Sequence, residues 1–106
     1  ENPEARYGMA VALFQSGRLD ESLLLFRNLG DYRESRAYLG RIYERTADAA
    51  AKPESRIALL RKSLDAYLPP GAGVRGGDRE RGVELAYRLL DLLDRDFEER
   101  LDRVEA

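Results

Sequence analysis

The chain has 106 residues, of which 43% are hydrophobic and 36% are charged, and its formal net charge is −2. This length suits one domain or a piece of a larger protein, and the slight negative charge argues against nucleic-acid binding as the main role. The chain contains no cysteine and no histidine. Disulfides, thiol chemistry and the commonest general base and metal ligand are therefore excluded, and the compartment is left open between cytoplasm and periplasm.

Two further expectations follow from the order of residues along the chain. No apolar stretch approaches the roughly 20 residues of a membrane-spanning helix, so we expect no direct insertion into a membrane. Because the chain begins at Glu1 and has no signal-like segment, we expect a piece of a longer protein.

The first two predicted helices lie before residue 31. Asn2 is a good capping residue and Pro3 suits the first helical position, so a helix is expected to begin there. Its apolar face contains Tyr7, Ala10, Leu13 and Phe14. Gly17 predicts the end of this helix, because glycine tolerates the left-handed conformation beyond a helix terminus. Asp20 is expected to cap a second helix, which Gly30 closes.

A second pair of helices is predicted up to residue 68. Asp31 and Glu34 have the spacing of a capping box at the start of a third helix. Alanine-rich sequence extends that helix as far as Ala51, and Pro53 begins a fourth helix. The apolar positions of these two helices are Tyr38, Leu39, Ile42, Tyr43, Ile57, Leu60, Leu64 and either Tyr67 or Leu68.

The last part of the chain is predicted to be one long helix. A flexible loop rich in Pro and Gly is expected over 69–77, and Asp78 is expected to cap a helix over 78–106. Its apolar residues recur at steps of three and four, which is nearly a heptad stripe. They are Val83, Ala86, Leu90, Leu93, Phe97, Leu101 and Val104. No strand is predicted, so the fold class is all-α with about five helices.

Two stretches of the chain resemble one known helix-pair unit. The first is Met9-Ala10-x-x-Leu13-x-x-x-Gly17-x-Leu19-x-Glu21-Ser22-x-x-x-Phe26-x-x-Leu29, and the second contains Leu39-Gly40-x-x-Tyr43 and Leu60-x-x-Ser63-Leu64. The first unit resembles a tetratricopeptide repeat, which has small residues where Ala10 and Ser22 stand and a turn glycine where Gly17 stands. The segment 29–35 is similar to a linker of bacterial proteins with degenerate repeats of this kind, so a bacterial source is expected.

The resemblance implies a short solenoid of helical hairpins. Residues 1–68 would form two helix pairs, and 78–106 would cap them within a single compact domain. The spacing departs from the family's, whose repeat is about 34 residues long. The second helix of the first pair is expected to be a turn short, and the connection between Tyr43 and Leu60 to be about four residues too long.

The resemblance also implies where a partner would bind, because the first helix of each repeat lines a concave groove in this family. The candidate partner-binding residues are Tyr7, Val11, Phe14, Gln15, Arg41, Glu44 and Arg45. Arg41 and Arg45 would meet an acidic group or a C-terminal carboxylate. The alternative interpretation is that Arg41 and Arg45 form only a solvent-exposed basic edge. The other aromatic residues, Phe26, Tyr38, Tyr43 and Phe97, are expected in the core.

Chemistry is not expected of this chain. Gly71-x-Gly73-x-x-Gly76 matches the dinucleotide fingerprint in letters, but a helix and two prolines precede it where that motif needs a strand, so we interpret it as loop. Asp91, Asp94 and Glu98 are interpreted as a solvated acidic face. We therefore expect no catalytic, cofactor or metal site and no enzyme.

The function that follows is a protein-interaction module for a protein or peptide partner, bound by the first and third helices. The alternative is a structural domain that associates through the C-terminal helix. The chain is expected to be a monomer or a homodimer.

Overall fold

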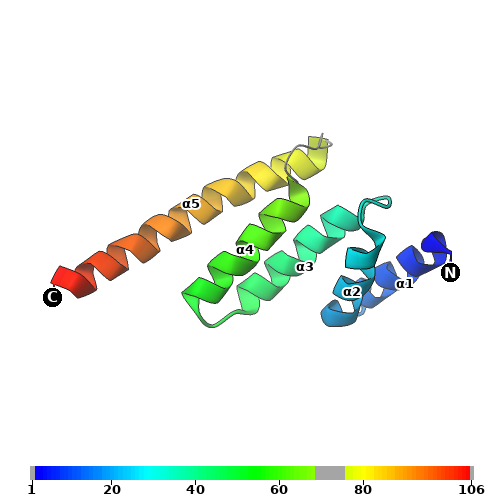
Figure 1. The fold of residues 1–106 in the computed structure, drawn as a ribbon, viewed down its shortest axis with the longest axis horizontal. Helices are drawn as coiled ribbons and strands as arrows, with labels where there is room; N and C mark the ends of the chain where they lie inside the picture. Colours follow the sequence, from blue (N-terminus) through cyan, green and yellow to red (C-terminus); the bar gives the residue numbers. More distant parts are fainter. Residues whose placement is uncertain (1, 69–75, 106) are drawn as a thin grey trace.

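The computed structural model describes residues 2–68 and 76–105. They form five helices: α1 (Pro3–Gln15), α2 (Leu19–Leu29), α3 (Ser35–Ala49), α4 (Pro53–Tyr67) and α5 (Gly76–Glu105) (Figure 1). The described residues contain no strand. The all-α class and the long last helix are therefore confirmed.

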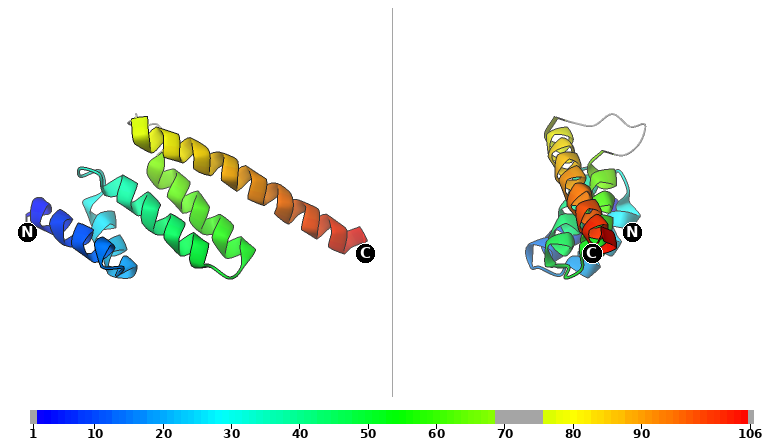
Figure 2. Two further views of the ribbon diagram at one scale, coloured as in Figure 1. Left: turned by 180° about the vertical axis from the view of Figure 1, so that it is seen from behind. Right: turned by 90° about the vertical axis from the view of Figure 1, so that its left-hand side faces the viewer.

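Each helix packs on the next one along the chain, from α1 to α5. α1 and α2 form one hairpin, and α3 and α4 form another. α5 lies along α4, and its C-terminal half extends beyond the other four helices (Figure 2). The molecule is accordingly elongated, with principal dimensions of 58 × 29 × 17 Å.

Local chemistry determines several helix ends as predicted. The side-chain oxygen of Asn2 accepts a hydrogen bond from the backbone N–H of Glu4 at 2.9 Å. Gly17 and Gly30 follow α1 and α2 with φ angles of 82° and 61°, in the left-handed region that glycine tolerates. Pro53 is the first residue of α4.

Four predicted helix ends are wrong. α2 begins at Leu19, so Asp20 lies within its first turn. α3 begins at Ser35 without a side-chain cap, and Asp31 pairs instead with Arg36. α3 ends at Ala49 and not at Ala51.

The fourth concerns α5, which begins at Gly76, ahead of the predicted cap at Asp78. Most of the predicted loop and of the glycine motif falls in 69–75, outside the described residues.

Each of the two hairpins contains a buried hydrogen bond of the same kind between its two helices. In the first, the Ser22 hydroxyl donates to the carbonyl of Ala10 at 2.9 Å. In the second, the Ser63 hydroxyl donates to the carbonyl of Gly40 at 2.7 Å. Both serines are fully buried, and each joins the second helix of its pair to a small residue of the first. A Cβ at Gly40 would come within 2.5 Å of the Tyr67 ring, so only glycine permits this close packing of α3 and α4.

The second hairpin is longer because its helices are longer. The bonded residues are 12 apart in the first hairpin and 23 apart in the second. The connection between α3 and α4 nevertheless covers only residues 50–52. The extra residues therefore extend α3 and α4, and the predicted long loop between Tyr43 and Leu60 is absent. α2 has 11 residues against 15 in α4, so it is about one turn shorter, as the spacing predicted.

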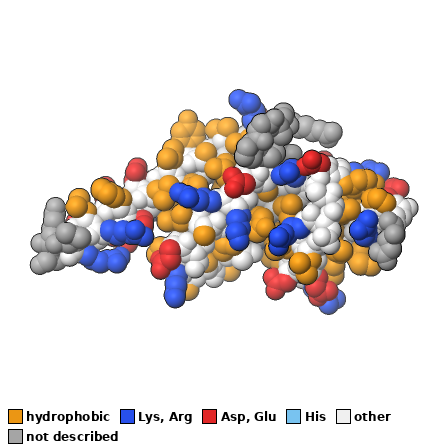
Figure 3. Space-filling view, viewed as in Figure 1, with side chains coloured by type: hydrophobic (Ala, Val, Ile, Leu, Met, Phe, Trp, Pro, Cys, Tyr) orange, Lys and Arg blue, Asp and Glu red, His pale blue; other side chains and the backbone are white. Residues whose placement is uncertain are grey.

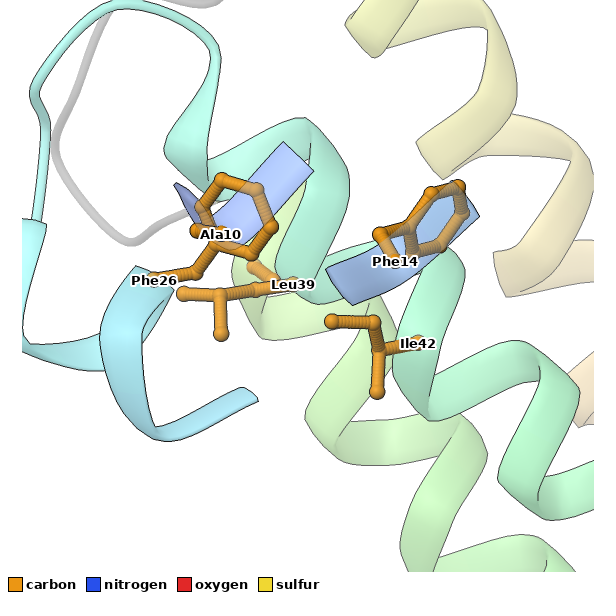
Figure 4. Close-up of a cluster of buried hydrophobic side chains, with 6 residues drawn as sticks. Ala10, Phe14, Phe26, Leu39 and Ile42 are labelled. Carbon is orange, nitrogen blue, oxygen red and sulfur yellow. The ribbon is translucent and has the colours of Figure 1, made fainter. Parts of the chain in front are cut away.

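The core consists of two buried clusters. In the first, Phe26 of α2 meets side chains of α1 and α3 (Figure 4). Its buried members are Ala10, Phe14, Phe26, Leu39, Ile42 and Ala66. The second cluster joins α3, α4 and α5, and its buried members are Ala37, Ala47, Leu60, Tyr67, Leu85 and Leu89.

α5 packs on α4 with a face that the sequence did not single out. Leu85 and Leu89 are buried, and a Cβ at Gly82 would collide with Leu68 at the end of α4. Leu90 and Phe97 of the predicted stripe are exposed instead, and the expected core position of Phe97 is wrong, since 66% of its surface is accessible. Figure 3 shows hydrophobic side chains exposed along this helix.

Candidate functional site

Two arginines of α3 lie over aromatic rings next to α1. The Arg41 guanidinium carbon is 4.9 Å from the ring centroid of Tyr38, and that of Arg45 is 4.4 Å from the ring centroid of Phe14. Both distances suit cation–π attraction, which is strongest when water is excluded from one face of the cation. We call Phe14, Tyr38, Arg41 and Arg45 the arginine–aromatic patch.

A cluster of aromatic rings supports this patch from below. The rings of Phe26 and Tyr38 are stacked, with centroids 4.7 Å apart and an interplanar angle of 3°. Phe14 meets Tyr38 edge to face at 5.2 Å, and Tyr7 meets Phe26, Tyr32 and Tyr38 at 5.7–6.2 Å. Burial raises the pKa of Tyr7 above its ordinary value. These rings come from α1, α2, α3 and the connection before α3, so their packing joins these elements. The two arginines therefore lie on a preorganised surface.

The charges of Arg41 and Arg45 are available to a ligand. Both side chains are exposed, and within residues 2–68 and 76–105 neither forms an ion pair or a hydrogen bond. They are four residues apart on one helix and therefore share a face. Two guanidinium groups so placed suit a carboxylate or another planar anion, which each can bind with two N–H donors.

The structure divides the seven predicted partner-binding residues. It brings Phe14, Arg41 and Arg45 together in the patch. Phe14 is buried, and it serves as the support for Arg45 rather than as a contact surface. Tyr7 and Val11 are half-buried and pack against the first core cluster, and Gln15 is exposed.

Glu44 does not face a ligand, contrary to the prediction. Its side chain is 9% exposed and accepts hydrogen bonds from the Tyr67 hydroxyl at 2.8 Å and from Arg81 Nε at 3.1 Å. A second nitrogen of Arg81 also pairs with it. One buried carboxylate thus joins α3, α4 and α5. The hydrogen bond to Glu44 raises the pKa of Arg81, which stays charged.

The buried position of Tyr67 predicts a loss of stability in alkali. Burial, and then the hydrogen bond to Glu44, raises the pKa of Tyr67 well above its ordinary value of 10.0. Above pH 10 the unfolded chain loses this proton while the folded protein keeps it, so the unfolded state binds fewer protons and stability falls as the pH rises. Below pH 10 the contribution is complete. We expect the free energy of unfolding to fall by up to about 1.4 kcal/mol per pH unit from this residue.

Urea unfolding from about pH 9 to about pH 11 measures this slope. Tyr67→Phe removes the titrating hydroxyl, and its stability should decline less steeply over the same range. An equally steep decline in Tyr67→Phe would assign the effect to other groups.

A hollow between α2, α3 and α4 was not predicted. It has a volume of about 410 Å³ and is lined by Arg27, Gly30, Arg36, Leu39, Tyr43, Lys62, Asp65 and Ala66. Arg36 is already paired with Asp31, and Asp65 offsets a further positive charge. The hollow is therefore a weaker anion site than the arginine–aromatic patch.

The described residues also bear on metal binding and membrane spanning. Among them no group of three or more acidic side chains is placed to hold a metal ion. Within the same residues no helix is both long and apolar enough to cross a membrane. Of the predicted acidic face, Asp91 pairs with Arg95 at 3.1 Å, while Asp94 and Glu98 are exposed.

No protein-family model, no curated protein and no solved structure matches this chain. The likeness to tetratricopeptide repeats therefore stays a prediction that depends on the residues quoted above.

Tyr38 packs against the first core cluster, as expected, but its position beneath Arg41 was not predicted. Tyr38 is half-buried and carries Arg41 on its ring. An aromatic residue three positions before an arginine on one helix is a usable signal for this arrangement, because such residues share a face.

Proposed function

We propose that this chain is a protein-interaction module that binds an acidic segment or a free C-terminal carboxylate of a partner at the arginine–aromatic patch. The observation that carries the proposal is the pair Arg41 and Arg45, held over aromatic rings without an acidic partner in the described residues. Preorganised cations lose little side-chain entropy when they bind an anion. The half-buried ring of Tyr38 offers apolar contact to the neighbouring residues of a bound segment.

The comparison of the two hairpins also supports the proposal. The hydrogen bonds of Ser22 and Ser63 occupy equivalent places in the two helix pairs. Such equivalence is expected if the pairs are repeats of one unit, as in a tetratricopeptide-like scaffold. Scaffolds of stacked helix pairs generally act by binding.

The test uses labelled peptides with a free acidic C-terminus, each compared with its C-terminally amidated form. We expect the intact protein to bind some of the free acids, and Arg41→Glu with Arg45→Glu to weaken that binding at least tenfold. Charge-assisted hydrogen bonds contribute about 1.5–3 kcal/mol each, and 1.4 kcal/mol corresponds to a factor of ten. Fluorescence anisotropy measures the dissociation constants.

The matched control is Arg27→Glu with Arg61→Glu, which changes the net charge equally on the exposed surface of α2 and α4. This variant should bind as the intact protein does. Binding that survives in the patch variant would contradict the proposal. Loss in the control alone would move the site to the hollow beside α2.

A further inference from the structure

α5 carries an apolar face that nothing in the structure covers within the described residues. Its exposed members, which we call the outer stripe, are Val83, Tyr87, Leu90, Phe97 and Leu101, with 41–71% of their surfaces accessible. With Asp94 included, the steps along the helix are four, three, four, three and four. This is the spacing of the two core positions of a coiled-coil heptad.

The outer stripe is not needed to hold α5 on the rest of the molecule. That role belongs to the inner face, where Leu85 and Leu89 are buried. Arg81 and Arg88 add ion pairs with Glu44 and Asp48 of α3. α5 is therefore apolar on two sides. A helix that only caps the fold needs one apolar face for packing, and its solvent-exposed side is normally polar.

The charges beside the outer stripe repeat with the same period. Glu84, Asp91 and Glu98 are seven residues apart and form an acidic rim along one edge, in which Glu84 pairs with Arg81 at 2.9 Å and Asp91 pairs with Arg95 at 3.1 Å. The other edge holds no acid in its corresponding positions, which are Arg79, Ala86, Leu93 and Arg100. The two rims are therefore unlike, and this difference determines how two such helices fit together.

We propose that the outer stripe of α5 binds the outer stripe of a second copy of this chain, with the two helices parallel. In an antiparallel pair each acidic rim would lie against the other acidic rim. In a parallel pair each acidic rim lies against the opposite rim, so that Arg79 meets the partner's Glu84 and no like charges face each other across Ala86 and Leu93. The buried contacts of α5 with the rest of the molecule centre on Leu85 and Leu89 of the inner face, and Leu93 at the edge of the outer stripe also packs against them.

The size of the stripe predicts a weak dimer. Its five side chains expose about 500 Å² per copy, given the area that large apolar and aromatic residues bury. Pairing would bury about 1,000 Å² in total, which is at the lower limit for a specific interface. Asp94 weakens the pair further, because in the parallel arrangement it lies opposite the partner's Asp94 in an apolar seam. We expect a dissociation constant on the order of micromolar to hundreds of micromolar.

Analytical ultracentrifugation of the full chain from about 1 µM to about 1 mM tests the pairing. The intact protein should pass from monomer to dimer over this range. Leu90→Glu with Phe97→Glu should stay monomeric, and Asp94→Leu should lower the dissociation constant at least tenfold. The matched control is Met9→Glu with Leu24→Glu, which alters equally exposed apolar residues elsewhere and should dimerise normally. Circular dichroism confirms that each variant keeps its helices.

Cross-linking tests the orientation, because the chain has no cysteine of its own. Leu101→Cys should form disulfide-linked dimers with itself under mild oxidation, since parallel helices place equal positions side by side. An antiparallel pair would instead link Leu101→Cys to Val83→Cys in a mixture, which would overturn the parallel arrangement. A monomer at every concentration, or dimerisation that persists in Leu90→Glu with Phe97→Glu, would overturn the proposal. Neither result bears on peptide binding at the arginine–aromatic patch, whose test is independent.

Discussion

Replacing Phe26 by alanine should lower the free energy of unfolding by about 3–5 kcal/mol, the usual cost of deleting a fully buried aromatic ring. Phe26 is 0% exposed and stands where α1, α2 and α3 meet. Its ring is stacked on Tyr38 and meets Tyr7 edge to face. Because α2 is the shortest helix, with 11 residues, few other contacts can offset the cavity.

Urea unfolding followed by circular dichroism measures this loss. Leu24→Ala is the matched control, since Leu24 lies on the same helix and is 60% exposed, and it should change stability by no more than about 0.5 kcal/mol. Phe26→Leu retains much of the volume and should cost clearly less than Phe26→Ala, which keeps the comparison measurable if the alanine variant unfolds. A loss below about 1 kcal/mol in Phe26→Ala would mean that this ring does not organise the first core cluster.

The sequence predicted the helices well because their signals are local. A prolyl residue at the first helical position marks the start of α1 and of α4, and glycine follows α1 and α2. The wrong starts of α2 and α3 have one physical cause. Asp20 and Asp31 are acceptable caps in isolation, but the chain geometry after Gly17 and Gly30 starts each helix elsewhere.

The packing of α5 could not be predicted because this helix has two apolar faces. Leu85 and Leu89 belong to one, and Leu90 and Phe97 belong to the other. Helical periodicity fits both, so sequence alone does not say which one meets α4. The choice depends on contacts between distant parts of the chain, such as the close approach of Gly82 to Leu68.

The candidate site was predicted in part for a related reason. The resemblance placed Arg41, Glu44 and Arg45 along one groove. Arg41 and Arg45 share a helix face because they are four residues apart. Glu44 does not lie with them. Its side chain turns instead toward Tyr67 and Arg81, which are 23 and 37 residues away, and no local pattern indicates such partners.

Glu44→Ala should therefore destabilise the fold and leave the arginine–aromatic patch intact. The substitution removes the acceptor of the buried Tyr67 hydroxyl and the carboxylate that pairs with Arg81. Leaving a buried donor without a partner costs about 1–3 kcal/mol. Arg81 is 46% exposed and regains water, so its share is small. We expect a total loss of about 2–3 kcal/mol.

A double-mutant cycle with Tyr67→Phe isolates this interaction. Phenylalanine at position 67 needs no acceptor, so Glu44→Ala should cost less in the Tyr67→Phe background than in the intact protein, with a coupling of at least about 0.5 kcal/mol. Independent effects of the two substitutions would show that the hydrogen bond does not stabilise the junction of α3 and α4. Peptide binding should be unchanged in Glu44→Ala under conditions where it is folded. Since Arg41 and Arg45 rest on Tyr38 and Phe14, neither depends on the Glu44 carboxylate for its position.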